Sequence, residues 1–236
     1  MAVKEMYEKY LEEISEVSLF QGIERLDIEA MLNCLKPIIG HYKRSDYIVN
    51  GGDKYESIGI VLKGSATVSK ENAAGNRSVM TLLKQGDIFG EIVAFSSVMT
   101  WPATVQAQEA CEILFLPRGK IIGDCERMCS WHRIFIQNFL RIISERAILL
   151  NKKVEYLTIK GIRAKICAYL LDQSKKIGNK KIVLPLNRNE LADFLNVSRP
   201  SMSREMGKLR DEGIIDFHLT EFEILDFQAL KNSMSE

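Results

Sequence analysis

The sequence predicts an α+β protein built from an N-terminal antiparallel β-roll of the jelly-roll kind, a long helix and a C-terminal winged helix-turn-helix. Three observations predict this order. Short apolar stretches alternate with glycine turns between residues 42 and 117, an unbroken apolar heptad seam follows, and two helices with clear start signals come after it. These patterns place the three parts at residues 1–129, 130–157 and 158–236.

The composition is that of a globular protein with a sizeable core. Of the 236 residues, 46% are hydrophobic and 27% are charged, and no apolar run is long enough to cross a membrane. The first fifteen residues are rich in Glu and Lys and lack the apolar stretch of a signal peptide, so we expect a cytoplasmic protein. The five cysteines are odd in number and scattered, which favours reduced thiols over a disulfide framework.

The N-terminal part begins with two short amphipathic helices over residues 1–36 and continues as strands. Glycine turns recur about every ten residues, which is typical of an antiparallel sandwich or barrel. The apolar stretches that predict strands are Ile58–Leu62, Ala66–Val68, Val79–Leu83 and Ile113–Leu116.

A long helix is predicted from about Ser130 to Leu157. Its seam has the 4,3 spacing of a coiled coil and consists of Ile136, Leu140, Ile143, Ala147, Leu150, Val154 and Leu157. A second apolar stripe beside the seam consists of Phe135, Phe139, Ile142 and Leu149. Two apolar faces allow the helix to pack on its own β-roll and on a partner helix, which favours a homodimer. The alternative is an ordinary core helix in a monomer.

The C-terminal part contains a helix, a tight turn and a second helix, followed by two short strands at Ile214–Phe217 and Phe222–Leu225. Asn187 and Glu190 form the pattern of a capping box at the start of the first helix. Asn196 suits a left-handed turn, and Ser198 is a plausible N-cap for the second helix. The buried stripe of that helix is expected to be Met202, Met206 and Leu209. This arrangement is a helix-turn-helix.

Charge and exposed side chains point to a nucleic-acid partner for this motif. Residues 151–210 hold 14 Lys or Arg and 5 Asp or Glu, a local charge of +9, whereas the whole chain carries +1. Such a basic block is typical of a surface that meets a polyanion. The residues expected to contact DNA, through base edges or phosphates, are Ser198, Arg199, Ser201, Ser203 and Arg204.

The chain resembles the Crp/Fnr family of transcription regulators over roughly residues 15–230. The segment LLKQGDIFGEIVAF looks like the β-roll signature of that family, and RNELADFLNVSRPSMSREMGKLRDEGII looks like its DNA-binding signature. The resemblance implies a cyclic-nucleotide-binding-like β-roll, a homodimer on a palindromic DNA site, a small-molecule effector, and RNA polymerase as a candidate partner. It places Arg199 and Arg204 at base-contacting positions and Ser198 at a phosphate contact. Pro200 replaces a glutamate common in the family, so the DNA sequence read by relatives is not carried over.

The effector site departs from the family pattern. In cyclic-nucleotide binders of the family, a Gly-Glu pair meets the ribose and an Arg-Ser pair about ten residues later holds the phosphate. Here Gly-Glu is present, but Trp101-Pro102 stands in place of Arg-Ser, without a cation for the phosphate. We therefore expect neither cyclic AMP nor cyclic GMP. Together with Phe95, this lining suits a less charged effector or none at all. The candidate pocket consists of Gly90, Glu91, Trp101, Ala103 and Thr104.

Two other functions were weighed. Cys125, Cys129 and His132 follow helical spacing and are candidate ligands for a metal ion or haem, although packing of small thiols explains the same residues. The N-terminal cysteine cluster of oxygen-sensing relatives is absent, since only Cys34 lies there. The β-roll also resembles cupin enzymes in shape, but His41, His132 and His218 are isolated, so no enzyme is expected. The sequence leaves open the effector, the target genes and whether the protein activates or represses.

Overall fold

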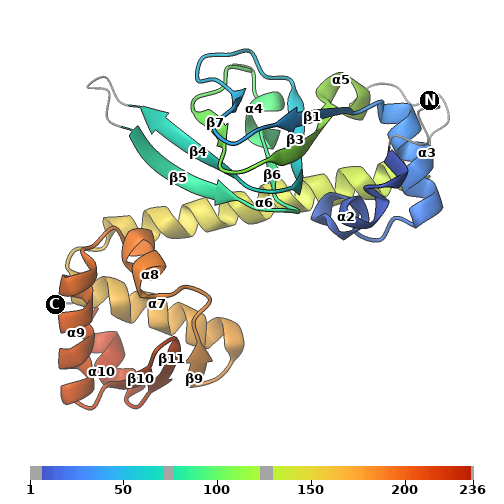
Figure 1. Cartoon of the computed structure of the whole chain (residues 1–236). Helices are drawn as coiled ribbons and strands as arrows, with labels where there is room; N and C mark the ends of the chain where they lie inside the picture. Colours follow the sequence, from blue (N-terminus) through green and yellow to red (C-terminus); the bar gives the residue numbers. More distant parts are fainter. Residues whose placement is uncertain (1–6, 72–76, 123–129, 235–236) are drawn as a thin grey trace. The chain divides into compact units, whose positions relative to one another are not determined.

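A computed structural model describes residues 7–71, 77–122 and 130–234 of the chain. The chain divides into two compact units, residues 1–144 and 145–236, and each is considered by itself. The division falls within helix α6 (Ser130–Thr158), which contributes its first half to one unit and its second half to the other (Figure 1). No helix in the described ranges is long and apolar enough to span a membrane.

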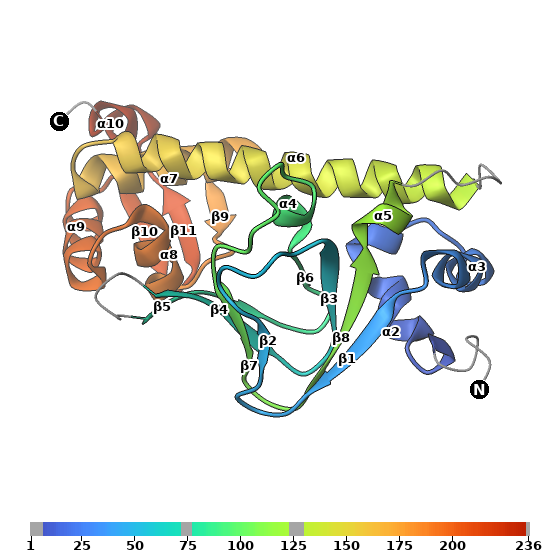
Figure 2. The ribbon, with the colours of Figure 1, turned by 90° about the horizontal axis from the view of Figure 1, so that it is seen from above.

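The first unit is an antiparallel β-roll with flanking helices, as predicted. Its helical elements before α6 are α2 (Leu11–Glu16), η1 (Ser18–Phe20), α3 (Arg25–Leu35), α4 (Glu91–Ala94) and α5 (Arg118–Ile121). Its strands are β1 (Ile38–Tyr42), β2 (Tyr47–Val49), β3 (Ser57–Lys63), β4 (Ala66–Glu71), β5 (Arg77–Leu83), β6 (Ile88–Phe89), β7 (Thr104–Ala107) and β8 (Cys111–Pro117). They form two sheets with the orders β1-β8-β3-β6 and β2-β7-β4-β5 (Figure 2).

The alternation of side chains along β3 and β8 creates two apolar clusters. Ile58 and Ile60 face the helices, where they join a cluster with α2, α3 and the start of α6. Val61 and Ile113 point to the other side, into a cluster that also contains residues of the second sheet. Both faces of β3 are therefore buried, which explains its nearly continuous apolar sequence.

The first half of α6 packs on the β-roll through the predicted second stripe. Phe135, Phe139 and Ile142 are buried there, and the Phe135 ring meets that of Phe20 edge to face at 5.6 Å. Leu149 was expected to continue this stripe, but it is 58% exposed. The prediction was wrong at this residue because Leu149 lies in the second unit, where it lines a cavity instead of the β-roll core.

The second unit is a winged helix-turn-helix. Its elements after α6 are α7 (Ile162–Ile177), β9 (Lys181–Val183), α8 (Arg188–Leu195), α9 (Arg199–Asp211), β10 (Ile215–His218), β11 (Glu221–Ile224) and α10 (Phe227–Asn232). The strands form one antiparallel sheet in the order β10-β11-β9. The helices and the sheet share one apolar cluster, so this unit has its own core.

Candidate DNA interface

Local sequence signals fix the ends of α8 and α9. The Asn187 side chain accepts hydrogen bonds from the backbone amides of Asn189 and Glu190, while the Glu190 carboxylate accepts one from the Asn187 amide, so the predicted capping box forms. Asn196 ends α8 in the left-handed conformation, with φ 52°. Ser198 then caps α9, with Pro200 in the first turn, where a missing N–H is not required.

Helix α9 is anchored on one side and exposed on the other. Met202, Met206 and Leu209 have relative exposures of at most 1% and belong to the core of this unit. Arg204 lies midway between Met202 and Met206, hence on the opposite side of the helix. The side chains of Arg199, Ser203 and Arg204 are all exposed, as the sequence predicted. The helix therefore presents polar and cationic groups on a rigidly packed support.

Two serines organise the N-terminal turns of α9. Ser198 Oγ accepts a hydrogen bond from the Ser201 amide at 3.3 Å and donates to Ser201 Oγ at 2.7 Å. Arg204 Nη2 also donates to Ser201 Oγ, at 3.2 Å. The Arg204 guanidinium is thus tethered before any ligand is present, whereas Arg199 makes no hydrogen bond or ion pair within the described chain. Lys208 further along is exposed and paired with Glu205 at 2.6 Å.

A buried lysine, which the sequence analysis missed, holds the turn between the two helices. Lys165 of α7 is only 9% exposed, and its Nζ donates to the carbonyl of Leu195 at 3.0 Å. A cation at the C-terminal end of a helix satisfies a free carbonyl and is favoured by the helix dipole. Nothing near Lys165 in the sequence indicates this role, because its partner lies thirty residues away.

The wing is attached to α8 and α9 by arginine–aromatic stacking, which was also missed. The Arg188 guanidinium lies 4.7 Å from the Phe217 ring and 4.6 Å from the Phe222 ring. Arg210 lies 5.1 Å from the Phe217 ring. Burial lowers the pKa of Arg188 from its ordinary value. These contacts tie the first residue of α8 and the end of α9 to the wing strands.

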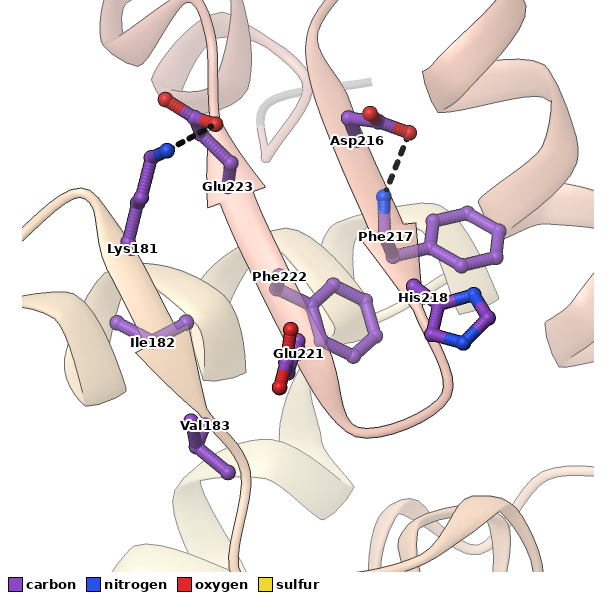
Figure 3. Close-up of a pocket in the computed structure, with 9 residues that line it drawn as sticks. All are labelled: Lys181, Ile182, Val183, Asp216, Phe217, His218, Glu221, Phe222 and Glu223. Carbon is purple, nitrogen blue, oxygen red and sulfur yellow. Dashed lines mark hydrogen bonds and ion pairs between the residues drawn. The ribbon is translucent and has the colours of Figure 1, made fainter.

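The hollow on the wing sheet is acidic. A cavity of about 270 Å³ lies there, lined by residues of all three strands (Figure 3). Three carboxylates line it, from Asp216, Glu221 and Glu223, and the lysine on its wall, Lys181, is paired with Glu223 at 3.4 Å. Such a surface repels phosphate, so the face that suits DNA is the exposed side of α9 and not this part of the wing.

The candidate effector residues in the β-roll are brought together around aromatic side chains. Gly90 has φ 82°, and a Cβ there would lie 2.1 Å from the Tyr55 ring. Trp101 is 6% exposed and packs on Tyr55 at 4.9 Å and on Phe89 at 6.1 Å between ring centroids. The space beside Gly90 is therefore occupied by aromatic rings of the chain itself.

The other candidate effector residues take different places. Ala103 is buried in the same cluster as Trp101. The Thr104 hydroxyl on β7 accepts a hydrogen bond from the Gly51 amide at 3.3 Å. Glu91 begins α4 and is 2% exposed, so a side chain expected to meet a ligand is enclosed by protein. Phe95, expected in the same lining, packs on Phe139 of α6 at 4.8 Å and belongs to the helix-side core.

The thiol–imidazole hypothesis falls partly outside the described residues. Cys125 and Cys129 lie in the range 123–129, which the structure does not describe. The Nε2–H of His132 donates to the Ile121 carbonyl at 2.7 Å. That bond leaves Nδ1 as the ring atom with a free lone pair. The metal or haem hypothesis stays a prediction.

The seam of α6 is accessible in the single chain. Leu140, Leu150 and Val154 are 57–58% exposed, Leu157 is 41% exposed, and Ile136 and Ile143 are half-buried. The four most exposed of these apolar side chains lie on one face of the helix, at heptad spacing. Single apolar residues on a surface are ordinary, but a continuous apolar stripe marks an interaction face.

Known proteins resemble both units. The family model described as cyclic nucleotide-binding domain matches residues 39–127, and the Crp-like helix-turn-helix domain matches residues 164–233. The cAMP-activated global transcriptional regulator CRP of Salmonella typhimurium is 22% identical over 184 residues, which cover 76% of this chain and 86% of that protein. The CRP-like cAMP-activated global transcriptional regulator of Mycobacterium tuberculosis is 20% identical over 210 residues, 86% of this chain and 89% of that protein.

The fold has the same relatives among solved structures. The catabolite activator protein of Thermus thermophilus matches with a TM-score of 0.53 and 20% identity, covering 92% of this chain and 98% of that one. A CooA variant from Carboxydothermus hydrogenoformans matches with a TM-score of 0.54 and 20% identity, covering 85% and 89% of the two chains. These matches confirm the predicted order of β-roll, long helix and helix-turn-helix.

Proposed function

This chain belongs to the Crp/Fnr family of DNA-binding transcription regulators, and we propose that it acts in the cytoplasm as a homodimer on a palindromic DNA site. The observation that carries the proposal is the exposed side of α9. There Arg199 and Arg204 stand beside a capped helix N-terminus on a buried methionine stripe. Arginine reads guanine through two parallel hydrogen bonds, and Ser198 at the helix start suits a phosphate.

The apolar seam of α6 supports the dimer. Two copies of a heptad stripe bury each other in a coiled coil, and a two-fold axis then relates the two α9 helices. Recognition helices in such dimers enter successive major grooves, about 34 Å apart. The basic charge of residues 151–210 adds the sequence-independent attraction that every DNA-binding protein needs.

The β-roll is proposed to serve regulation without cyclic AMP or GMP and without enzymatic chemistry. The names of the relatives include activation by cAMP. Here the buried Trp101 and its neighbour Pro102 offer a cyclic phosphate no cation. A buried phosphate diester without a positive partner would lose its hydration uncompensated. A contact with RNA polymerase belongs to the proposal, but no particular surface is assigned to it.

The test is to sequence the genomic fragments that the purified protein retains. We expect enrichment of a palindrome with half-sites about ten base pairs apart, and two protected segments on one face of the duplex in footprinting. Retention of random fragments, with affinity that depends on salt but not on sequence, would contradict the assignment of α9 as a reader of bases.

A further inference from the structure

A cavity of about 600 Å³ lies within the second unit, away from the exposed side of α9. It is bounded by α6, α7 and α8. Its floor consists of three rings, Tyr156, Tyr169 and Phe194, which meet edge to face with centroids 5.6–5.8 Å apart. Ile148 and Leu149 of α6 form an apolar rim and are 63% and 58% exposed. The volume is in the range of sites for small organic molecules.

One polar group on this floor lacks a partner. Tyr169 is 3% exposed, and within the described chain its hydroxyl makes no hydrogen bond. Its neighbour Tyr156 differs, since its hydroxyl donates to Asp172 at 2.9 Å. Burial raises the pKa of Tyr169 to about 12, so the hydroxyl stays protonated at neutral pH and is available as a donor. A buried polar group without a partner indicates that something absent from the single chain completes it.

The charges around the cavity do not select an ion. Lys152 is paired with Asp172 at 3.1 Å and with Glu155 at 2.8 Å. Of the remaining charged lining residues, Glu145 and Lys176 carry opposite signs. A rim with balanced charge and an aromatic floor favours a neutral ligand over an anion or a cation.

The cavity stays open in the proposed dimer. Its α6 residues Leu149, Lys152 and Tyr156 follow three- and four-residue spacing, so they share one face of the helix. The seam residues Leu150 and Val154 lie one position after Leu149 and two before Tyr156, which places them on a different face. A ligand in the cavity would therefore not compete with the partner helix.

We propose that this cavity binds a small neutral aromatic molecule that carries a hydrogen-bond acceptor, such as a ketone, ester or amide, with the acceptor on the Tyr169 hydroxyl. The ligand would touch the helix that carries the dimer seam, α7, and the first helix of the helix-turn-helix at once. It would thereby hold these helices in one arrangement and change the affinity for DNA. This regulatory consequence rests on the proposed function, whereas the binding site does not.

The test compares two probes of nearly equal shape, acetophenone and ethylbenzene, on the full-length protein. Binding is followed by NMR titration of the methyl groups of Ile148 and Leu149. We expect acetophenone to bind about two- to tenfold more tightly than ethylbenzene, the worth of one neutral hydrogen bond. In Tyr169→Phe this ratio should fall to about one while ethylbenzene binding is unchanged. The control Tyr47→Phe, at a tyrosine that is 59% exposed, should keep the ratio.

The outcomes separate the parts of the proposal. Equal binding of the two probes by the wild type, a ratio that Tyr169→Phe leaves intact, or tighter binding of benzoate than of acetophenone would each overturn it. So would the absence of saturable methyl shifts. If Tyr169→Phe does not fold, Leu149→Gln on the exposed rim must weaken both probes alike, or the site is wrong. Saturating acetophenone should alter DNA affinity in the wild type. Unchanged DNA affinity despite probe binding would refute the regulatory role, and failure to bind DNA at all would refute the proposed function alone.

Discussion

Replacing Arg204 by alanine should remove most of the sequence preference of the protein and leave its folding intact. The side chain is exposed, and its one hydrogen bond to a described residue goes to Ser201 Oγ at 3.2 Å. Loss of such a surface contact changes the free energy of unfolding by about 0.5 kcal/mol or less. Loss of a bidentate arginine–guanine contact costs about 1–3 kcal/mol per half-site, and so about 2–6 kcal/mol for a symmetric dimer. The Kd should therefore rise roughly 30-fold to 10⁴-fold.

The assay is a fluorescence anisotropy titration of each protein against the selected palindrome and all its single-base variants. For Arg204→Ala, variants at one base pair of each half-site should become equivalent to the original sequence. Lys208→Ala is the matched control, because Lys208 is exposed on the same helix but is paired with Glu205. It should weaken all sequences alike and reduce the salt slope by about one. If Arg204→Ala and Arg199→Ala both kept wild-type affinity and the same ranking of sequences, α9 would not be the reader.

Four further changes test other parts of the structure. Leu150→Glu should give monomers at micromolar concentration, because a seam leucine contributes about 1.5–3 kcal/mol and symmetry doubles the loss; a dimer in light scattering would contradict the seam. Cyclic AMP at millimolar concentration should neither release heat in calorimetry nor shift the melting temperature, and a shift of several degrees would contradict the expected lack of binding. Asn187→Ala should lower the free energy of unfolding in urea by about 1 kcal/mol through loss of the capping box, whereas the control Asn189→Ala should not. Hydrogen bonding from Arg163 lowers the pKa of Glu212, so the pair stabilises the fold above the ordinary value of 4.5 and less as pH falls through the lower folded-state value; Glu212→Gln should flatten this acid dependence of the melting temperature, and an unchanged profile would argue against the pair.

Local signals explain which parts of the fold were predictable. The capping box at Asn187, the left-handed Asn196 and the Ser198 cap each depend on residues within four positions, and all three are present as expected. Strands β1, β2 and β7 were not singled out, because they are three to five residues long and only partly buried, and Gly40 interrupts the pattern of β1. Their pairing with distant strands, not their own propensity, makes them strands.

The candidate site was predicted where function depends on one helix and missed where it depends on distant partners. The exposed face of α9 follows from its apolar spacing alone. The Arg188 stack could not be foreseen, because Phe217 and Phe222 lie about thirty residues further along the chain and only the wing brings them near. The absence of a cation at Trp101 was evident from the sequence, but its packing against Tyr55 and Phe89 required the tertiary structure.

The exposed leucines and valine of α6 make the amount of protein a variable in its own folding. A stripe with Leu140, Leu150, Val154 and Leu157 in water costs free energy that only a second chain can recover. By mass action the melting temperature should then rise with protein concentration, because dissociation precedes or accompanies unfolding. A cell that makes few copies would hold a larger fraction as monomers, which present an adhesive surface to chaperones and proteases. Gene dosage and turnover would thus be coupled to regulatory strength through the same side chains.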